Sequence, residues 1–226
     1  MNENSTLPTP IGFEPHQEKP RLRGVIHQWS AVVALVAGVV LVSMAATVNH
    51  AVAAAIYSFS LLTLFSVSAM YHRINWRPPA RLLMRRLDHA AIFVLIAGTY
   101  TPMALIALGP GAGTNLFVVS WSCAVVGIIK SIFWPGSPKW VTAALAVVAG
   151  WCLIPYLGAL GQALDGLQLF LFLGGGVLYT IGALTYAAKR PNPIVGVFGY
   201  HEVFHAFTVV AAAMHFAAIV TVIRAI

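Results

Sequence analysis

Residues 29–48 read WSAVVALVAGVVLVSMAATV, a stretch of 20 residues without a charged side chain. This length matches one helical crossing of a bilayer, which takes about 20 apolar residues. The whole chain of 226 residues is similar in character, because only 8% of it is charged and 59% is hydrophobic. An ordinary soluble domain has about 25% charged residues, so this composition excludes a water-soluble globular protein.

Six further apolar runs follow, and each is long enough to cross the membrane as a helix. We therefore predict an all-α integral-membrane bundle of seven transmembrane helices. Turn-forming residues separate the runs, for example at Asn49-His50. Residues 1–28 are predicted to form a polar tail and residues 29–226 the transmembrane domain, which leaves no length for a second, soluble domain. The predicted spans cover approximately residues 29–48, 51–71, 90–108, 114–133, 141–160, 167–188 and 200–223.

The basic residues predict the orientation. A cytoplasmic N-terminus puts every Lys and Arg except Arg224 on the cytoplasmic side, as the positive-inside rule requires. Seven spans then put the C-terminus outside. These charges lie in loops between spans and not on one accessible face, so they do not indicate nucleic-acid binding. We expect a multi-pass protein of the cell (inner or plasma) membrane with membrane lipids as partners. The oligomeric state stays open.

The most basic segment separates the second and third spans. Arg73, Arg77, Arg81 and Arg85 follow one another at four-residue intervals, with leucines between the last two. Two interpretations are open. Residues 80–87 form a short interfacial helix that meets anionic headgroups, or the arginines are a topology anchor, which is common beside spans. We favour the anchor.

Five polar side chains fall at one end of the predicted bundle. His72 ends the second span, one turn after Ser68, and Asp88 precedes the third span. His201 and His205 occupy the first turns of the seventh span. The predicted orientation puts all five at the cytoplasmic end. Ionisable residues are costly at membrane depth and usually face the bundle interior, where they mark functional sites.

The spacing of the histidines indicates a metal site. His201 and His205 are four residues apart, which puts both imidazoles on one helix face. An isolated pair of this kind is weak evidence, but His72 adds a third neutral imidazole, and such a set suits Zn²⁺ with a fourth position left to water. Asp88 would hold that water or orient a ligand imidazole. Ser68 is equally compatible with a place in the site and with a hydrogen bond to its own helix backbone.

The other ionisable residues in the spans are expected to lie outside this site. His89 points about 100° away from Asp88 on an ideal helix and is predicted to contact headgroups or a loop. Glu202 is turned away from its histidine neighbours, and an acid in the first turn favours the helix dipole. His215 is predicted to be a core histidine bonded to another helix. No role is assigned to His16, His27 and His50.

Three motifs resemble those of the bacterial hemolysin III family. They read SAMYH at residues 68–72, LDHAAIF at residues 87–93 with AGTYTP at residues 97–102, and GYHEVFH at residues 199–205. They occur in the expected order on the second, third and seventh spans, and the similarity covers nearly the whole chain. The family is related to the progestin and adipoQ receptors and, more distantly, to the alkaline ceramidases.

The resemblance implies a seven-helix protein with a cytoplasmic N-terminus and a zinc ion held by His72, His201 and His205. It also implies that Asp88 contacts the zinc through water and that Ser68 lies beside the site. Relatives have been connected with ceramidase-type hydrolysis of lipid amides.

We therefore expect a zinc-dependent hydrolase of a lipid amide or ester. Zinc would polarise the carbonyl and lower the pKa of its water towards about 7. Asp88 would position that water or accept its proton, and Ser68 would donate a hydrogen bond to the developing oxyanion. Two alternatives stay open: a zinc-stabilised receptor or regulator of lipid composition without catalysis, and a hemolysin-like permeability factor. The substrate also stays open.

Overall fold

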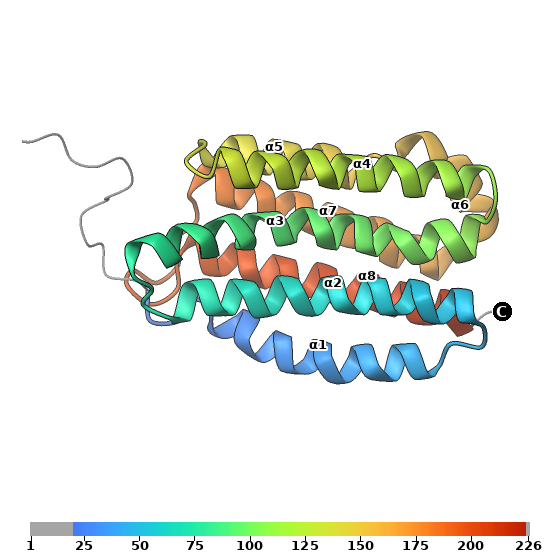
Figure 1. Ribbon diagram of the computed structural model, residues 1–226, viewed down its shortest axis with the longest axis horizontal. Helices are drawn as coiled ribbons and strands as arrows, with labels where there is room; N and C mark the ends of the chain where they lie inside the picture. Colours follow the sequence, from blue (N-terminus) through green and yellow to red (C-terminus); the bar gives the residue numbers. More distant parts are fainter. Residues whose placement is uncertain (1–19, 225–226) are drawn as a thin grey trace, which may run out of the picture.

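The computed structural model describes residues 20–224, which form a bundle of helices (Figure 1). Seven helical segments in this range are long and apolar enough to cross a membrane, which confirms the predicted fold class. Within the same range, β-structure is limited to an isolated bridge between Ile194 and Phe198. The elements are α1 (Val25–Ser43), α2 (Val48–Arg73), α3 (Pro78–Pro102), η1 (Met103–Leu108), α4 (Ala112–Phe133), α5 (Lys139–Gly150), η2 (Ile154–Tyr156), α6 (Leu157–Ala163), α7 (Gly166–Ala188) and α8 (Tyr200–Arg224).

Two of the crossings are interrupted helices. The third crossing passes from α3 into the π-helical η1, and the change falls at Pro102, which lacks a backbone donor. The fifth crossing passes from α5 to α6 through a 3₁₀ turn that contains Pro155. Such breaks persist inside membranes where neighbouring groups satisfy the freed backbone. Here the hydroxyl of Tyr100 donates a hydrogen bond to the carbonyl of Gly150, at the end of α5.

The connection between α1 and α2 differs from the prediction, because a capping residue starts α2 earlier in the sequence. Thr47 is the N-cap of α2, and its hydroxyl accepts a hydrogen bond from the backbone N–H of His50 at 3.2 Å. A threonine oxygen at this position satisfies one of the free donors of the first turn. The connection therefore lies at residues 44–47, and Asn49-His50 belongs to α2. The predicted turn at these two residues was wrong.

The first crossing begins within the predicted polar tail. α1 starts at Val25 after Gly24, which has a left-handed backbone (φ 77°). Residues 1–19 of the predicted tail lie outside the described residues.

The basic segment after α2 belongs to a long helix. α3 begins at Pro78 and continues without a break through residues 80–87, so these residues do not form a separate interfacial helix. Proline is favoured at the first helical position, where its missing N–H has no partner to lose.

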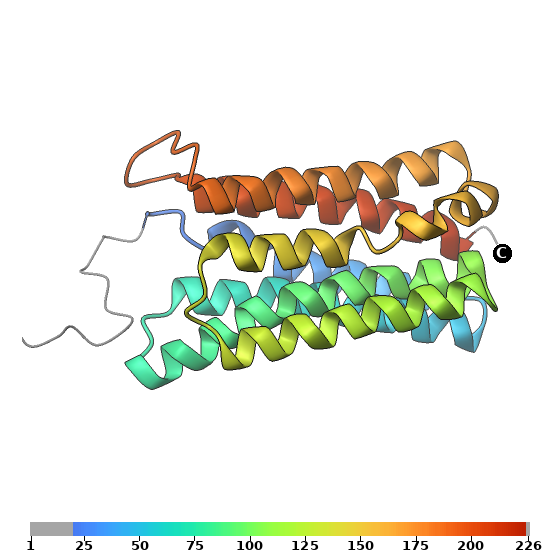
Figure 2. The same ribbon diagram turned by 90° about the horizontal axis from the view of Figure 1, so that it is seen from above.

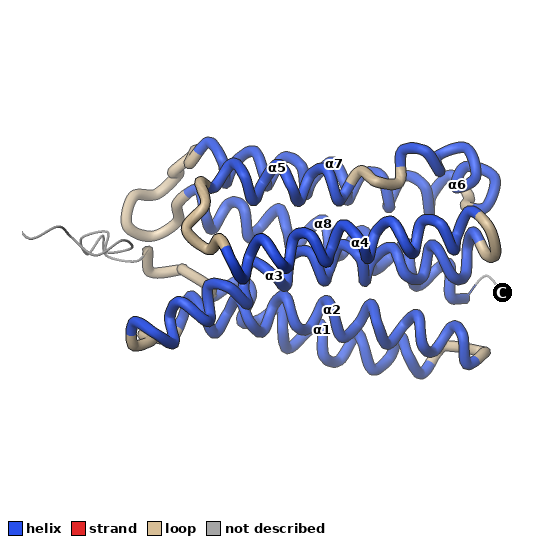
Figure 3. The backbone as a smooth tube through the Cα atoms, turned by 45° about the horizontal axis from the view of Figure 1, so that its top comes forward, coloured by secondary structure: helices blue, strands red, loops and turns tan. Residues whose placement is uncertain are grey.

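Loops gather at the two ends of the bundle, apart from the irregular residues between α5 and α6 (Figure 3). Consecutive helices α1, α2, α3 and α4 pack side by side, α7 packs on α8, and α5 lies against α7 and α3 (Figure 2). The starts of α1, α3, α5 and α8 and the end of α2 share one end of the bundle, which we call the N-terminal face (Figure 1). The C-terminus lies at the opposite end. The side of the membrane that each face occupies stays a prediction.

The outer surface is apolar, as a lipid-facing surface should be. On α1, Val33, Val36 and Val39 are 67%, 62% and 65% exposed, whereas Ala34 and Leu41 on its inner side are buried. The ionisable side chains that the sequence puts at membrane depth, such as His72, Asp88 and His205, are buried inside the bundle instead.

Candidate metal centre

Two helices bring three histidines together at the N-terminal face. His72 lies in the last turn of α2, and His201 and His205 lie in the first two turns of α8. All three are buried. One ring nitrogen from each residue lies within 4.8 Å of the other two, and Nε2 of His201 is 3.0 Å from Nε2 of His72. We call these three residues the histidine cluster.

The donor set of this cluster fits a metal ion. Three imidazoles are a frequent ligand set for Zn²⁺ in catalytic sites. The short approach of His72 to His201 is either a hydrogen bond, with one ring as donor and the other as acceptor, or the approach of two ligands that share an ion. Among residues 20–224, no other group of three His, Cys, Asp or Glu residues converges in this way.

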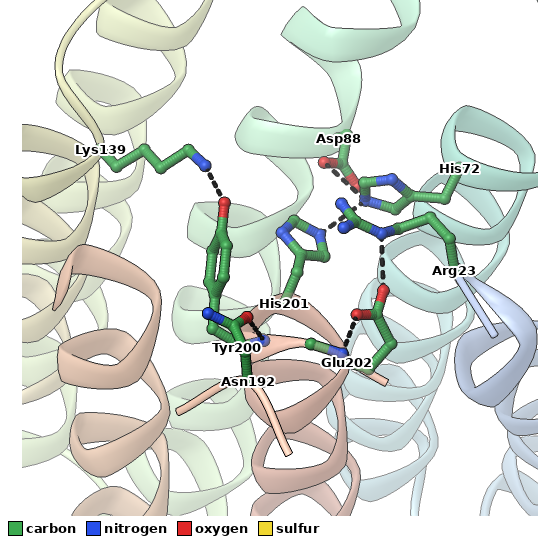
Figure 4. A network of polar contacts seen from close by, with 9 residues as sticks. Arg23, His72, Asp88, Lys139, Asn192, Tyr200, His201 and Glu202 are labelled. Carbon is green, nitrogen blue, oxygen red and sulfur yellow. Dashed lines mark hydrogen bonds and ion pairs between the residues drawn. The ribbon is translucent and has the colours of Figure 1, made fainter. Parts of the chain in front are cut away.

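Asp88 and Ser68 lie beside the histidine cluster. Asp88 is a buried residue of α3, and its Oδ2 is 3.9 Å from Nε2 of His72 (Figure 4). Ser68, one turn before His72 on α2, is buried and lines the same cavity as Asp88. Three helices therefore contribute side chains to one polar cluster, and Ser68 is directed towards it.

Glu202 forms a second polar link next to the cluster. Its side chain is 1% exposed, and Oε1 lies 2.6 Å from Nε of Arg23 (Figure 4). Its Oε2 accepts a hydrogen bond from the backbone N–H of Gly199 at 2.8 Å. Glu202 does cap the start of α8, in line with the helix-dipole argument, but that argument missed the ion pair that joins this helix to the segment before α1.

The segment before α1 packs closely against the cluster. Backbone N–H groups of residues 21 and 22 donate hydrogen bonds to the carbonyls of residues 196 and 197 at 3.1 and 3.2 Å. Gly24 lies against the end of α2, where an added Cβ would be 2.7 Å from Cβ of His72. The chain before α1 is thus held between α2 and the loop that precedes α8.

Two further histidines lie next to the site, contrary to expectation. His27, to which no role was assigned, is 2% exposed, and its ring stacks on that of His205. His89 was expected to contact headgroups or a loop, but it is buried and lines the same cavity as the cluster. The prediction for His215 is confirmed, because its Nε2 is 2.8 Å from the carbonyl oxygen of Phe172 on α7.

A cavity of about 280 Å³ opens beside the histidine cluster and extends into the bundle. Near the N-terminal face its wall includes the cluster and Asp88. Along the helices the wall becomes mainly aliphatic and aromatic, with Leu95, Ile96, Val147 and Tyr179. The cavity therefore has a polar end and an apolar length, as a binding site for an amphiphile would.

Comparison with known proteins identifies the family. The family model described as Haemolysin-III related matches residues 15–216, which is most of the chain. The chain belongs to the hemolysin III family. Hemolysin-3 of Bacillus cereus is 32% identical over 196 residues, which cover 85% of this chain and 86% of the relative. Hemolysin-3 homolog of Bacillus subtilis (strain 168) is 34% identical over 161 residues, which cover 71% of this chain and 72% of the relative.

The relationship extends to animal proteins. Monocyte to macrophage differentiation factor of Homo sapiens is 26% identical over 201 residues, which cover 85% of this chain and 79% of the relative. This similarity links the hemolysin III family to the progestin and adipoQ receptors. Together with the seven apolar helices, the family membership identifies a multi-pass membrane protein.

Proposed function

We propose that this member of the hemolysin III family is a membrane-embedded, zinc-dependent hydrolase of a lipid amide or ester. The observation that carries the proposal is the position of the histidine cluster, three buried imidazoles at the polar end of a cavity of about 280 Å³. A site of this kind offers ligands for an ion and room for an amphiphile beside them.

Each residue of the cluster has a separate part in this proposal. His72, His201 and His205 would hold the ion. When bound, zinc would supply an electrophile for the lipid carbonyl and a water of lowered pKa. Asp88 would accept a proton from the attacking water, because its carboxylate lies next to the cluster without being one of the three converging ligands.

Ser68 has a positioning role in this proposal. Its buried hydroxyl, which lines the same cavity as Asp88, would donate its single proton to the Asp88 carboxylate, so the same proton would not be available to a developing oxyanion at that moment. The bond would hold the carboxylate towards His72. Ser68 would therefore act on the reaction through Asp88.

The proposed orientation suits a lipid substrate. Arg73, Arg77 and Lys139 lie at the ends of helices on the N-terminal face, and the positive-inside rule puts such a face in the cytoplasm. The histidine cluster would then lie near the cytoplasmic headgroups of the cell membrane, at the depth of the polar linkage of a lipid. The hydrocarbon tail would extend along the apolar part of the cavity.

Metal content is the first test of this function. We expect about one zinc ion per chain in detergent-purified protein and none in a His201→Ala/His205→Ala double variant, because structural ligands determine metal binding. His50→Ala is the matched control, since His50 is a buried histidine of α2 at the opposite end of the bundle. Zinc-loaded protein that cleaves no lipid amide or ester across a broad panel would overturn the enzymatic part.

A second candidate is a zinc-stabilised receptor or regulator of lipid composition. It is favoured by the origin of the ligands, because one ion would join the end of α2 to the start of α8 without any bond being broken. An exchangeable water at the ion, detected by magnetic relaxation of a paramagnetic substitute, favours the hydrolase. A sealed site favours the receptor.

A permeability factor is a third candidate, suggested by the name Hemolysin-3 of the Bacillus cereus relative. Leakage of dye from liposomes that contain the purified protein tests it. Leakage that persists after alanine replacement of the histidine cluster would favour this candidate over the other two.

A further inference from the structure

Besides Arg23, which pairs with Glu202, three basic side chains line the cavity outside the histidine cluster. They are Arg81 and Arg85 of α3 and Lys139 of α5. Arg85 comes from α3 and Lys139 from α5, so the same cavity receives basic side chains from two helices. We call these three residues the basic rim.

The direction of the two arginines argues against a topology anchor alone. Leu82, Leu83 and Leu87 of the same helical segment are 42%, 54% and 44% exposed on the outside of the bundle. Arg85 of this segment is instead partly buried and lines the internal cavity, and the exposed Arg81 lines the cavity as well. Anchoring arginines need only water and headgroups, so their direction towards a cavity requires another reason.

The basic rim has no anionic partner within the described part of the chain. Both carboxylate oxygens of Glu202 are taken, by Arg23 and by the backbone of Gly199. The Asp88 carboxylate lies 3.9 Å from His72. Residues 20–224 contain no ion pair to Arg81, Arg85 or Lys139.

The contacts that the rim does make leave donors free. The Arg81 guanidinium lies over the ring of Tyr71 at 5.8 Å from its centroid. The Lys139 ammonium contacts the hydroxyl of Tyr200 and lies 4.8 Å from the centroid of that ring (Figure 4). An ammonium group has three N–H donors, so two remain for a ligand. Arg85 and Lys139 are partly buried, and their strongest hydrogen bonds would be to an anionic partner.

We propose that the basic rim binds the anionic headgroup, a phosphate or carboxylate, of a lipid whose hydrocarbon chain occupies the cavity. The inference rests on the proposed function, because it names the class of lipid that the histidine cluster would meet. Arginine and lysine donors match phosphate and carboxylate oxygens, and the apolar wall beyond the cluster matches a hydrocarbon chain.

Binding is tested without metal and without turnover. Full-length protein in nanodiscs of neutral phosphatidylcholine is treated with EDTA, and equilibrium binding of radiolabelled oleoyl lysophosphatidate is compared with that of 1-oleoylglycerol. Both probes carry the same chain, and only the first carries a phosphate. We expect the charged probe to bind at least about tenfold more tightly, because hydrogen bonds to charged groups are the stronger ones. Added salt should weaken its binding.

Variants assign the effect to the rim. Arg85→Gln/Lys139→Gln should weaken lysophosphatidate binding at least about tenfold and leave 1-oleoylglycerol binding unchanged. Arg77→Gln is the matched control, because it removes an exposed arginine from the same end of the bundle and does not line the cavity. The two single variants replace the double variant if it does not fold.

Three results would overturn the inference. Equal binding of the two probes by wild-type protein would show that the cavity has no site for an anionic headgroup. This comparison needs no variant. An equal loss in Arg77→Gln would reduce the effect to general surface charge. Inorganic phosphate that binds as tightly as lysophosphatidate would show that the hydrocarbon chain of the lipid contributes nothing to the affinity. A protein without hydrolytic activity would still give a clear answer, because no step of this test depends on turnover.

Discussion

The imidazole rings of His27 and His205 stack face to face, with centroids 3.8 Å apart and planes inclined by 6°. His27 comes from the first turn of α1, and Phe65 of α2 contacts it edge-on at 5.1 Å. His205 belongs to the histidine cluster. The stack holds the His205 ring from outside the ligand set, and contacts of this kind tune the affinity of metal sites.

Replacing His27 by alanine should weaken zinc binding about tenfold, because the His205 ring gains freedom to rotate away from the ion. Competition with a chromophoric chelator measures this affinity. His27→Phe is the matched control, since it keeps an aromatic ring for the stack without offering a ligand nitrogen. Unchanged affinity in the alanine variant would show that the stack is packing alone.

The buried partner in the Arg23–Glu202 ion pair determines which substitution costs more. Glu202 is 1% exposed and Arg23 is 21% exposed. Arg23→Gln leaves a buried carboxylate without its cation and should lower the free energy of unfolding by about 1–3 kcal/mol. Glu202→Gln leaves a cation that reaches water and should cost less.

Unfolding in mixed detergent micelles measures both variants and their combination. The double variant should be more stable than the sum of the single effects predicts, because the two side chains interact directly. Arg21→Gln, an exposed neighbour in the same segment, serves as the control. Additive effects would contradict an energetic role for the pair.

The seven crossings could be predicted because the thickness of the hydrocarbon core imposes a minimum length on each apolar run. The histidine cluster could be predicted in part. The four-residue spacing of His201 and His205 puts them on one helix face, and the order of the crossings puts His72 at the same depth. The three positions needed no knowledge of side-chain packing, and the structure puts their ring nitrogens within 4.8 Å of one another.

The burial of His89 and the Arg23–Glu202 ion pair could not be predicted from the sequence, because both depend on how the helices pack. The argument for His89 assumed that only one side of its helix faces the interior, but the third crossing, Pro78–Leu108, is the most buried of the seven. His89 therefore lies inside although it points away from Asp88. The pairing of Arg23 with Glu202 depends on how the segment before α1 lies against α8, and no local pattern in either segment indicates it.

Gly24 combines a positive φ angle with a close approach to His72, and Gly196 has the positive φ angle alone. Gly24 and Gly196 have similar positive φ angles of 77° and 75°, so alanine at either position should cost roughly 1–2 kcal/mol of backbone strain. Only at Gly24 would the new Cβ meet another residue, His72, whereas the space around Gly196 is free within 4 Å. Gly24→Ala should therefore weaken zinc binding as well as stability.

Thermal unfolding and chelator competition separate these two effects. Gly196→Ala should lower only the melting temperature. A Gly24→Ala variant that loses stability but keeps the zinc affinity of the wild type would show that the close approach does not position His72.

Asp88 distinguishes a hydrolase from a metal clamp. Its Oδ2 is 3.9 Å from Nε2 of His72, and the carboxylate is not among the three groups that converge as ligands. Asp88→Asn should therefore retain about one zinc ion per chain and lower turnover of a cleaved lipid by at least about 100-fold, as loss of a general base does. Ser68→Ala should retain zinc and lower turnover less, because it acts only through the carboxylate.

Metal analysis and hydrolysis rates are measured on the same preparations. If Asp88→Asn loses its zinc, the carboxylate is itself a ligand and the division of roles is wrong. If zinc and turnover both persist, another group accepts the proton. Retained zinc together with lost turnover is the one result that a clamp without catalysis does not produce, because a clamp has no turnover to lose.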